Sequence, residues 1–228
     1  MTVPRARWLV ALAALALSIA AAPARAAAFL VPLGGTQVAL DAPPGFADTG
    51  FLGSPRLDEL AQSLTSASNR ILLFAITDGD LRAFMNGDQP ALRRYMIAVV
   101  PRSLARRSVS LDEFAALVGD ALHGLGKPAG SADYPKFLDR QPAGQASLLA
   151  DLRSGPEAVS VLQGTRMPPQ GGYGEKPRYL LSSTTWLLLR GKALSVSVYT
   201  AYDSPADLDW IKLVTQRWID KLQRINSR

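Results

Sequence analysis

Few side chains in this sequence have the type and spacing that a catalytic centre needs. The 228 residues include a single histidine, His123, and no cysteine, so serine-type catalysis would depend on that one imidazole as its base. No Gly-x-Ser-x-Gly segment occurs, and helical spacing turns His123 away from the apolar stripe of its predicted helix. We therefore interpret His123 as a surface residue and expect no catalytic residues. A hydrolase remains an open alternative, because two carboxylates that are far apart in the sequence can meet in the folded protein.

Metal and phosphate chemistry are poorly supported as well. Zinc needs three or four ligands from cysteine, histidine and carboxylate, and this chain offers one histidine and no thiolate. Asp78-Gly79-Asp80 could open a calcium loop, but Arg82 stands at the next alternate position. Gly124-Leu125-Gly126-Lys127 precedes Pro128 where a phosphate-binding loop needs serine or threonine, and the glycines at 171–174 precede no helix. The sequence predicts no metal and no cofactor.

The strongest remaining feature is a row of cations on the last predicted helix. Arg217, Lys221 and Arg224 recur at i, i+4 and i+7 and so line one edge of it. They could bind an anionic partner, but cations near a helix C-terminus also complement the helix dipole. We name these three as candidate partner-binding residues with both interpretations open. A second basic cluster, interpreted as part of a solvated loop, contains Arg102, Arg106 and Arg107.

The N-terminus has the pattern of a secretory signal peptide. Arg5 and Arg7 precede an uncharged run at 8–22, and Ala24-Arg25-Ala26 fits the small-x-small cleavage rule. The run is shorter than the roughly 20 residues that cross a bilayer. We predict a signal peptide at 1–26 and a periplasmic or secreted protein, with a retained anchor as the alternative. Cleavage would lower the formal charge from +6 to +3, which does not favour nucleic acid as a partner.

The spacing of apolar residues predicts the elements that must position any site. Helical stripes begin after Ser54, Ser110 and Ser204 and predict helices over 55–68, over 111–125 and from 205 onward. The β-prone runs expected to form strands are 29–33, 36–40, 71–77, 95–100, 158–166, 179–189 and 193–202.

The order of these elements predicts the fold class and the domain organisation. Strands joined mainly by hairpins, with helices between groups of them, indicate an α+β fold: a largely antiparallel sheet covered by about three helices. The composition, 48% apolar and 19% charged, is that of a globular protein. We expect a single domain over 27–228 with a loop-rich insertion near 127–157, which contains at most a short helix at 147–152.

The turn Gly34-Gly35, the following strand and the segment 44–48 (Pro-Gly-Phe-Ala-Asp) resemble the opening of the PsbP-like and DcrB-like families. Their pattern is a diglycine turn, a strand and then Pro-x-Gly-aromatic-x-Asp, and the closing strand-glycine-strand-helix around Gly191 is also similar to theirs. The middle of the chain departs from the pattern. Gly45 also follows Pro44 directly, so an intervening residue exists only if Pro43 is taken as the proline of the pattern. The resemblance implies a helix-covered sheet in an exported accessory or assembly protein, and it brings no catalytic residues.

These observations favour a noncatalytic periplasmic or exported accessory protein. It would bind an envelope protein or an anionic envelope component and keep no membrane span after signal removal. The alternative is a small-molecule or lipid-binding carrier, because a helix-covered sheet can hold an apolar pocket. Such a pocket would lie near Trp186 or Trp210, with the loops at 127–157 and 167–178 as its gates.

Overall fold

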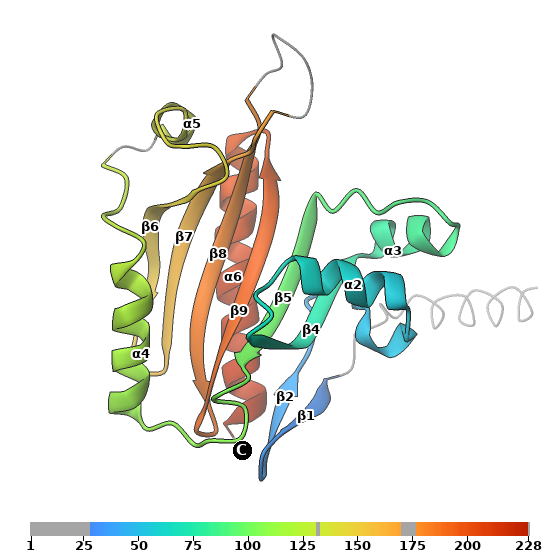
Figure 1. The fold of residues 1–228 in the computed structure, drawn as a ribbon, viewed down its shortest axis with the longest axis vertical. Coiled ribbons are helices and arrows are strands. Elements are labelled where there is room, and N and C mark those ends of the chain that lie inside the picture. Colours follow the sequence, from blue (N-terminus) through green and yellow to red (C-terminus); the bar gives the residue numbers. More distant parts are fainter. Residues whose placement is uncertain (1–27, 131–132, 170–176, 228) are drawn as a thin grey trace, which may run out of the picture.

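A seven-stranded antiparallel sheet dominates the computed structural model, which describes residues 28–130, 133–169 and 177–227 (Figure 1). In sheet order its strands are β3 (Phe46–Asp48), β4 (Asn69–Thr77), β5 (Arg94–Pro101), β9 (Lys192–Tyr202), β8 (Tyr179–Leu189), β7 (Ala158–Arg166) and β6 (Ala146–Ser154). Every neighbouring pair is antiparallel. The α+β prediction is therefore confirmed. The predicted signal peptide at 1–26 lies outside the described residues.

In the described residues, five α-helices and one 3-10 turn accompany the sheet. They are η1 (Gly50–Leu52), α2 (Pro55–Ser63), α3 (Asp78–Met85), α4 (Leu111–His123), α5 (Tyr134–Leu138) and α6 (Pro205–Asn226). The three predicted helices correspond to α2, α4 and α6, and α2 is shorter than expected. In the described ranges, no helix is long and apolar enough to cross a membrane.

The two faces of the sheet carry different helices. On one face, Ile211, Trp218 and Leu222 of α6 belong to the main core, together with Met96 of β5 and Val198 of β9. On the other face, α2 packs its buried side chains against β4 and β5 in a smaller cluster formed by Leu57, Ala61, Phe74, Ile76 and Tyr95. Alternation along each strand explains this division, because successive side chains point to opposite faces.

A separate hairpin, β1 (Phe29–Leu33) and β2 (Thr36–Leu40), packs against the C-terminal half of α6 (Figure 1). Asn226 holds it by accepting from the Ala39 N–H and donating to the Ala39 carbonyl, each at 2.8 Å. Its turn uses Gly34 at φ +61°, where a Cβ would lie 2.8 Å from the Arg106 carbonyl oxygen. The predicted diglycine hairpin is confirmed, and its glycine also permits close packing on residues 102–107.

The middle of the chain is more regular than its sequence pattern indicates. Residues 147–152, expected as a short helix, lie in β6, which pairs with β7 through two register shifts. These shifts disturb the alternation by which a strand is recognised in sequence. The five-residue helix α5 was also not predicted, because one turn and a half of helix carries no measurable periodicity.

Three local predictions from the sequence need correction: a turn at Asp78-Gly79-Asp80, Gly191 as the first central residue of the last hairpin turn, and a capping box formed by Ser110 and Glu113. Asp78-Gly79-Asp80 opens α3 rather than forming a turn, because the Thr77 hydroxyl accepts from the Asp80 N–H at 3.0 Å and caps the helix. In the β8–β9 hairpin, Gly191 is the second central residue and not the first, since Leu189 pairs with Lys192 and Arg190 also has positive φ. Glu113, expected to complete a capping box, instead forms an ion pair with Arg107.

Candidate functional site

A groove runs along the outer edge of β4, between that strand and α2. It encloses about 590 Å³. Its walls are residues 48–50, the α2 side chains Asp58, Ala61 and Gln62, residues 65–67, the β4 run 69–74, and Arg102. It lies beside the face on which α2 packs, away from α6.

The β4 edge is only partly covered by its neighbour. β3 pairs with Ala75, Ile76 and Thr77, and the Thr49 N–H and hydroxyl both donate to the Phe74 carbonyl. No strand in the described ranges pairs with residues 69–73 on this side. A register shift between Ile71 and Leu73 forms a bulge within the uncovered stretch. The groove therefore has the edge of a β-strand as part of its floor.

Asp48 and Arg70 lie toward opposite ends of this β4 edge. Burial raises the pKa of the Asp48 carboxyl, although N–H groups of Gly50, Phe74 and Thr49 oppose the rise. The Gly50 N–H donates to its Oδ1 at 3.2 Å. At the other end, Arg70 and Arg102 line both the groove and a second cavity. The site therefore has a carboxyl at one end and two guanidinium groups at the other.

That second cavity is an arginine cleft. It encloses about 400 Å³ and is lined by Pro32, Gly34, Arg70, Arg102, Ala105 and Arg106. Arg70 is the second residue of β4, Arg102 follows β5, and Arg106 lies in the turn that packs on the β1–β2 hairpin. No carboxylate is among its lining residues. Below, the arginine cleft means this cavity with its three arginines, Arg70, Arg102 and Arg106.

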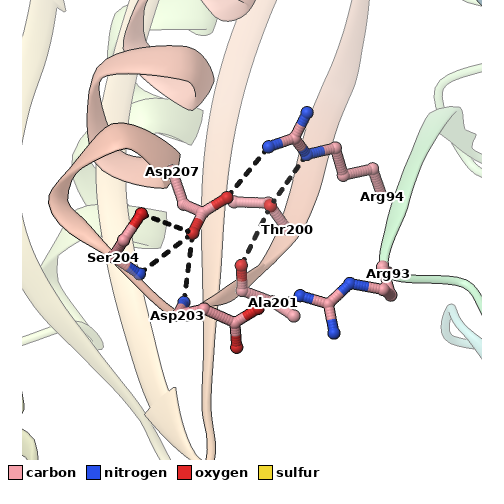
Figure 2. Close-up of polar contacts among 7 residues, drawn as sticks. All are labelled: Arg93, Arg94, Thr200, Ala201, Asp203, Ser204 and Asp207. Atoms are coloured by element: carbon pink, nitrogen blue, oxygen red, sulfur yellow. Dashed lines mark hydrogen bonds and ion pairs between the residues drawn. The ribbon is translucent and has the colours of Figure 1, made fainter.

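A different group of arginines lies at the N-terminus of α6 (Figure 2). Arg94 donates to Asp207 at 2.9 Å, and Arg93 forms an ion pair with Asp203. The second oxygen of Asp207 accepts the N–H groups of Asp203 and Ser204 at 3.1 Å each, which completes a capping box. Burial opposes the charge of Asp207, but these hydrogen bonds outweigh it and hold its pKa below the ordinary value. Each charge here has a partner, so the group stabilises the fold.

The structure separates the three predicted partner-binding residues. Arg217 and Arg224 are exposed on α6, as expected. Lys221 instead forms an ion pair with Asp41, whose side chain is almost fully buried after β2. The Trp218 indole N–H donates to the Asp41 carbonyl at 2.8 Å beside it. Lys221 therefore fixes the hairpin to α6, whereas the binding role of Arg217 and Arg224 stays a prediction.

The second basic cluster is also divided by the fold. Arg107 is paired with Glu113, whereas Arg102 and Arg106 face the cleft together with Arg70. The sequence pattern placed Arg102 and Arg106 in a solvated loop and gave no signal for Arg70, which lies 32 positions before Arg102. Strand pairing brings them together, because Asn69 pairs with Pro101 and the Arg102 N–H donates to the Ser68 carbonyl.

The other chemical candidates acquire no new partners. His123 is exposed at the end of α4, with its Nδ1 3.3 Å from the Gly119 carbonyl. Within the described part of the chain, no three histidine or acidic residues gather as metal ligands. The glycines at 171–174 lie outside the described residues.

The predicted carrier pocket also lacks a structural counterpart among the main cavities. Neither Trp186 nor Trp210 lines the two cavities described above. The Trp210 ring lies 6.2 Å from that of Phe46 and is covered by the Arg94 guanidinium at 4.1 Å. The space beside Trp210 is therefore occupied by packed aromatic and cationic groups. The α6 side of the sheet also holds a cavity of about 540 Å³ between β6, β7 and α6, which neither tryptophan lines, so the carrier stays a prediction.

Comparison with known proteins identifies no family for this chain. No family model matches it, and no curated protein matches it. One matching solved structure is the 1.9 Å crystal structure of the Saccharomyces cerevisiae Ran-binding protein Mog1p, with 12% identity and a TM-score of 0.39. The match covers 87% of this chain and 94% of that one. The resemblance to the PsbP-like and DcrB-like families is therefore wrong as a family assignment: no family model matches the chain, and the turn motifs that suggested it belong to hairpins that many folds share.

Proposed function

We propose that this chain is an exported, noncatalytic accessory protein that binds another protein of the cell envelope in the groove between α2 and β4. The uncovered β4 edge is the observation that carries the proposal. Backbone N–H and C=O groups at such an edge can pair with an extended segment of a partner. The signal-type N-terminus and the lack of a catalytic set support the export and accessory parts.

The same edge is protected against pairing with other copies of itself. The bulge between Ile71 and Leu73 interrupts a regular ladder, and Arg70 places a positive charge on the strand. Bulges and charges are the usual devices that keep edge strands from aggregating. A partner that fits must therefore complement both the shape and the charge of the groove.

Site-specific crosslinking tests the proposal. Because the sequence contains no cysteine, an introduced cysteine is the single site of attachment for the crosslinker. A photoreactive maleimide would be attached at Gln62→Cys in the groove and, as the control, at Leu213→Cys, which is exposed on α6. We expect a defined protein adduct in the cell envelope from position 62 and none from position 213. Identical patterns from the two positions, or none from position 62, would contradict the groove as a binding surface.

Mass spectrometry of the recovered protein tests the remaining parts. A mature chain that begins at Ala27 is expected for an exported protein, whereas an intact N-terminus would contradict cleavage. A reproducible small-molecule mass on the native protein would favour the carrier alternative over the accessory role.

A further inference from the structure

We propose that the arginine cleft is a binding site for a phosphate-type oxyanion. This inference concerns a cavity that shares Arg70 and Arg102 with the neighbouring groove but has its own ligand, and it does not depend on a protein partner in that groove. It rests on how the side chains of Arg70 and Arg102 are held, on the lack of a carboxylate among the residues that line the cleft with Arg106, and on the contacts that fix its walls.

The guanidinium groups are oriented by the backbone rather than by acids. Arg70 donates through Nη1 to the Pro32 carbonyl at 3.1 Å, and Arg102 through Nε to the Ala67 carbonyl at 3.2 Å. An arginine has five N–H donors, so each retains several for a ligand. Carbonyl oxygens fix the position of a cation without neutralising it. The cleft therefore keeps its positive charge.

The walls that carry these arginines are fixed by independent contacts. Lys192, almost fully buried, donates from Nζ to the Arg107 carbonyl at 2.7 Å, and Arg107 pairs with Glu113 of α4. On the opposite side, Gly34 lies against the Arg106 backbone too closely for any larger residue. A site whose walls are already ordered loses little conformational entropy when a ligand binds.

The charge of the cleft favours phosphate over a simple carboxylate. Three like charges around one cavity repel one another, and a dianion offsets more of that repulsion than a monoanion. The planar guanidinium fork accepts phosphate and carboxylate oxygens alike in a bidentate contact, so the charge of the ligand makes the difference. The phosphate could be free or part of a lipid headgroup, and both present the same oxyanion.

The test is a titration of the full chain in chloride buffer with inorganic phosphate, followed through the arginine Nε–H signals in NMR spectra. We expect saturable shifts at Arg70 and Arg102 with millimolar or tighter affinity. Arg102→Gln/Arg106→Gln should weaken binding at least tenfold. The matched control, Arg217→Gln/Arg224→Gln, removes the same charge from α6 and should change the affinity less than twofold.

The outcomes separate a built site from general attraction to positive charge. Shifts that do not saturate, or equal weakening by the two double variants, would overturn the proposal. Thermal unfolding of both variants checks that each is folded. Crosslinking from position 62 tests partner binding in the groove separately, so either proposal can be contradicted without the other.

Vesicles then identify the source of the phosphate. The chain would be mixed with vesicles of phosphatidylcholine alone or with one quarter phosphatidylglycerol. Vesicle binding that needs phosphatidylglycerol, is lost in Arg102→Gln/Arg106→Gln and is reversed by phosphate supports the site with a headgroup as ligand. Saturable phosphate binding without vesicle binding supports the same site with a free phosphate compound.

Discussion

Two groups of arginines in this molecule have the same side chain and opposite surroundings. At the N-terminus of α6, Arg93 and Arg94 face Asp203 and Asp207. In the arginine cleft, Arg70 and Arg102 are held by backbone carbonyls and no carboxylate lines the cavity. The first group has its counter-charges within the fold, so it stabilises the native state. The second leaves its charge available, which is the condition for binding an anion.

The strongest test of a paired cation is the replacement of Lys221, which forms an ion pair with the buried Asp41 carboxylate. Lys221→Met leaves that carboxylate without its cation in a site closed to water. We expect a loss of about 3 kcal/mol in the free energy of unfolding, measured by urea denaturation. The control is Arg224→Gln at an exposed position three residues further along α6, which should change the free energy of unfolding by less than about 0.5 kcal/mol. Equal effects would mean that the ion pair does not anchor the hairpin.

Gly34→Ala tests whether the hairpin sets the cleft wall. The new Cβ would lie 2.8 Å from the Arg106 carbonyl oxygen, at a backbone angle of φ +61°. We expect a loss of about 2 kcal/mol in the free energy of unfolding, together with weaker phosphate binding. Gly35→Ala is the control, because nothing lies within 4 Å of its added Cβ. Unchanged phosphate affinity in Gly34→Ala would show that the hairpin does not position Arg106.

Arg94→Gln tests the paired arginines through pH. Because Asp207 has a lowered pKa in the folded protein, its charge stabilises the fold above the ordinary value of 3.8, and this contribution is lost as pH falls below it. We expect Arg94→Gln to lower the free energy of unfolding by about 1–2 kcal/mol at neutral pH. In urea titrations the difference from wild type should shrink below about pH 4. A difference that is constant with pH would indicate lost packing on Trp210 instead.

The cleft arginines should have the smallest effect on stability. Arg102→Gln/Arg106→Gln removes like charges that repel each other, so the free energy of unfolding should stay within about 0.5 kcal/mol of wild type or rise slightly at low salt. Added phosphate should raise the melting temperature of the wild type but not of this variant. A loss of more than about 2 kcal/mol without phosphate would place these arginines with the paired group.

Several parts of the fold follow directly from local sequence patterns. The apolar stripe after Ser204 specifies α6, and the β-prone runs on both sides of Gly191 specify the β8–β9 hairpin. The α+β class follows from the order of such elements. Short or bulged elements such as α5 and β6 do not, because their periodicity is interrupted or too brief to detect.

The roles of the charged residues were decided only by tertiary structure. The sequence determined that Arg217, Lys221 and Arg224 share an edge of one helix, since helical spacing is local. It could not indicate that Asp41, 180 positions away, takes Lys221 as its partner. Nor could it bring Arg70 beside Arg102, which requires the pairing of β4 with β5. A pattern along the chain fixes which side chains share a face, but a charge is neutralised or left free by residues that only folding places opposite it.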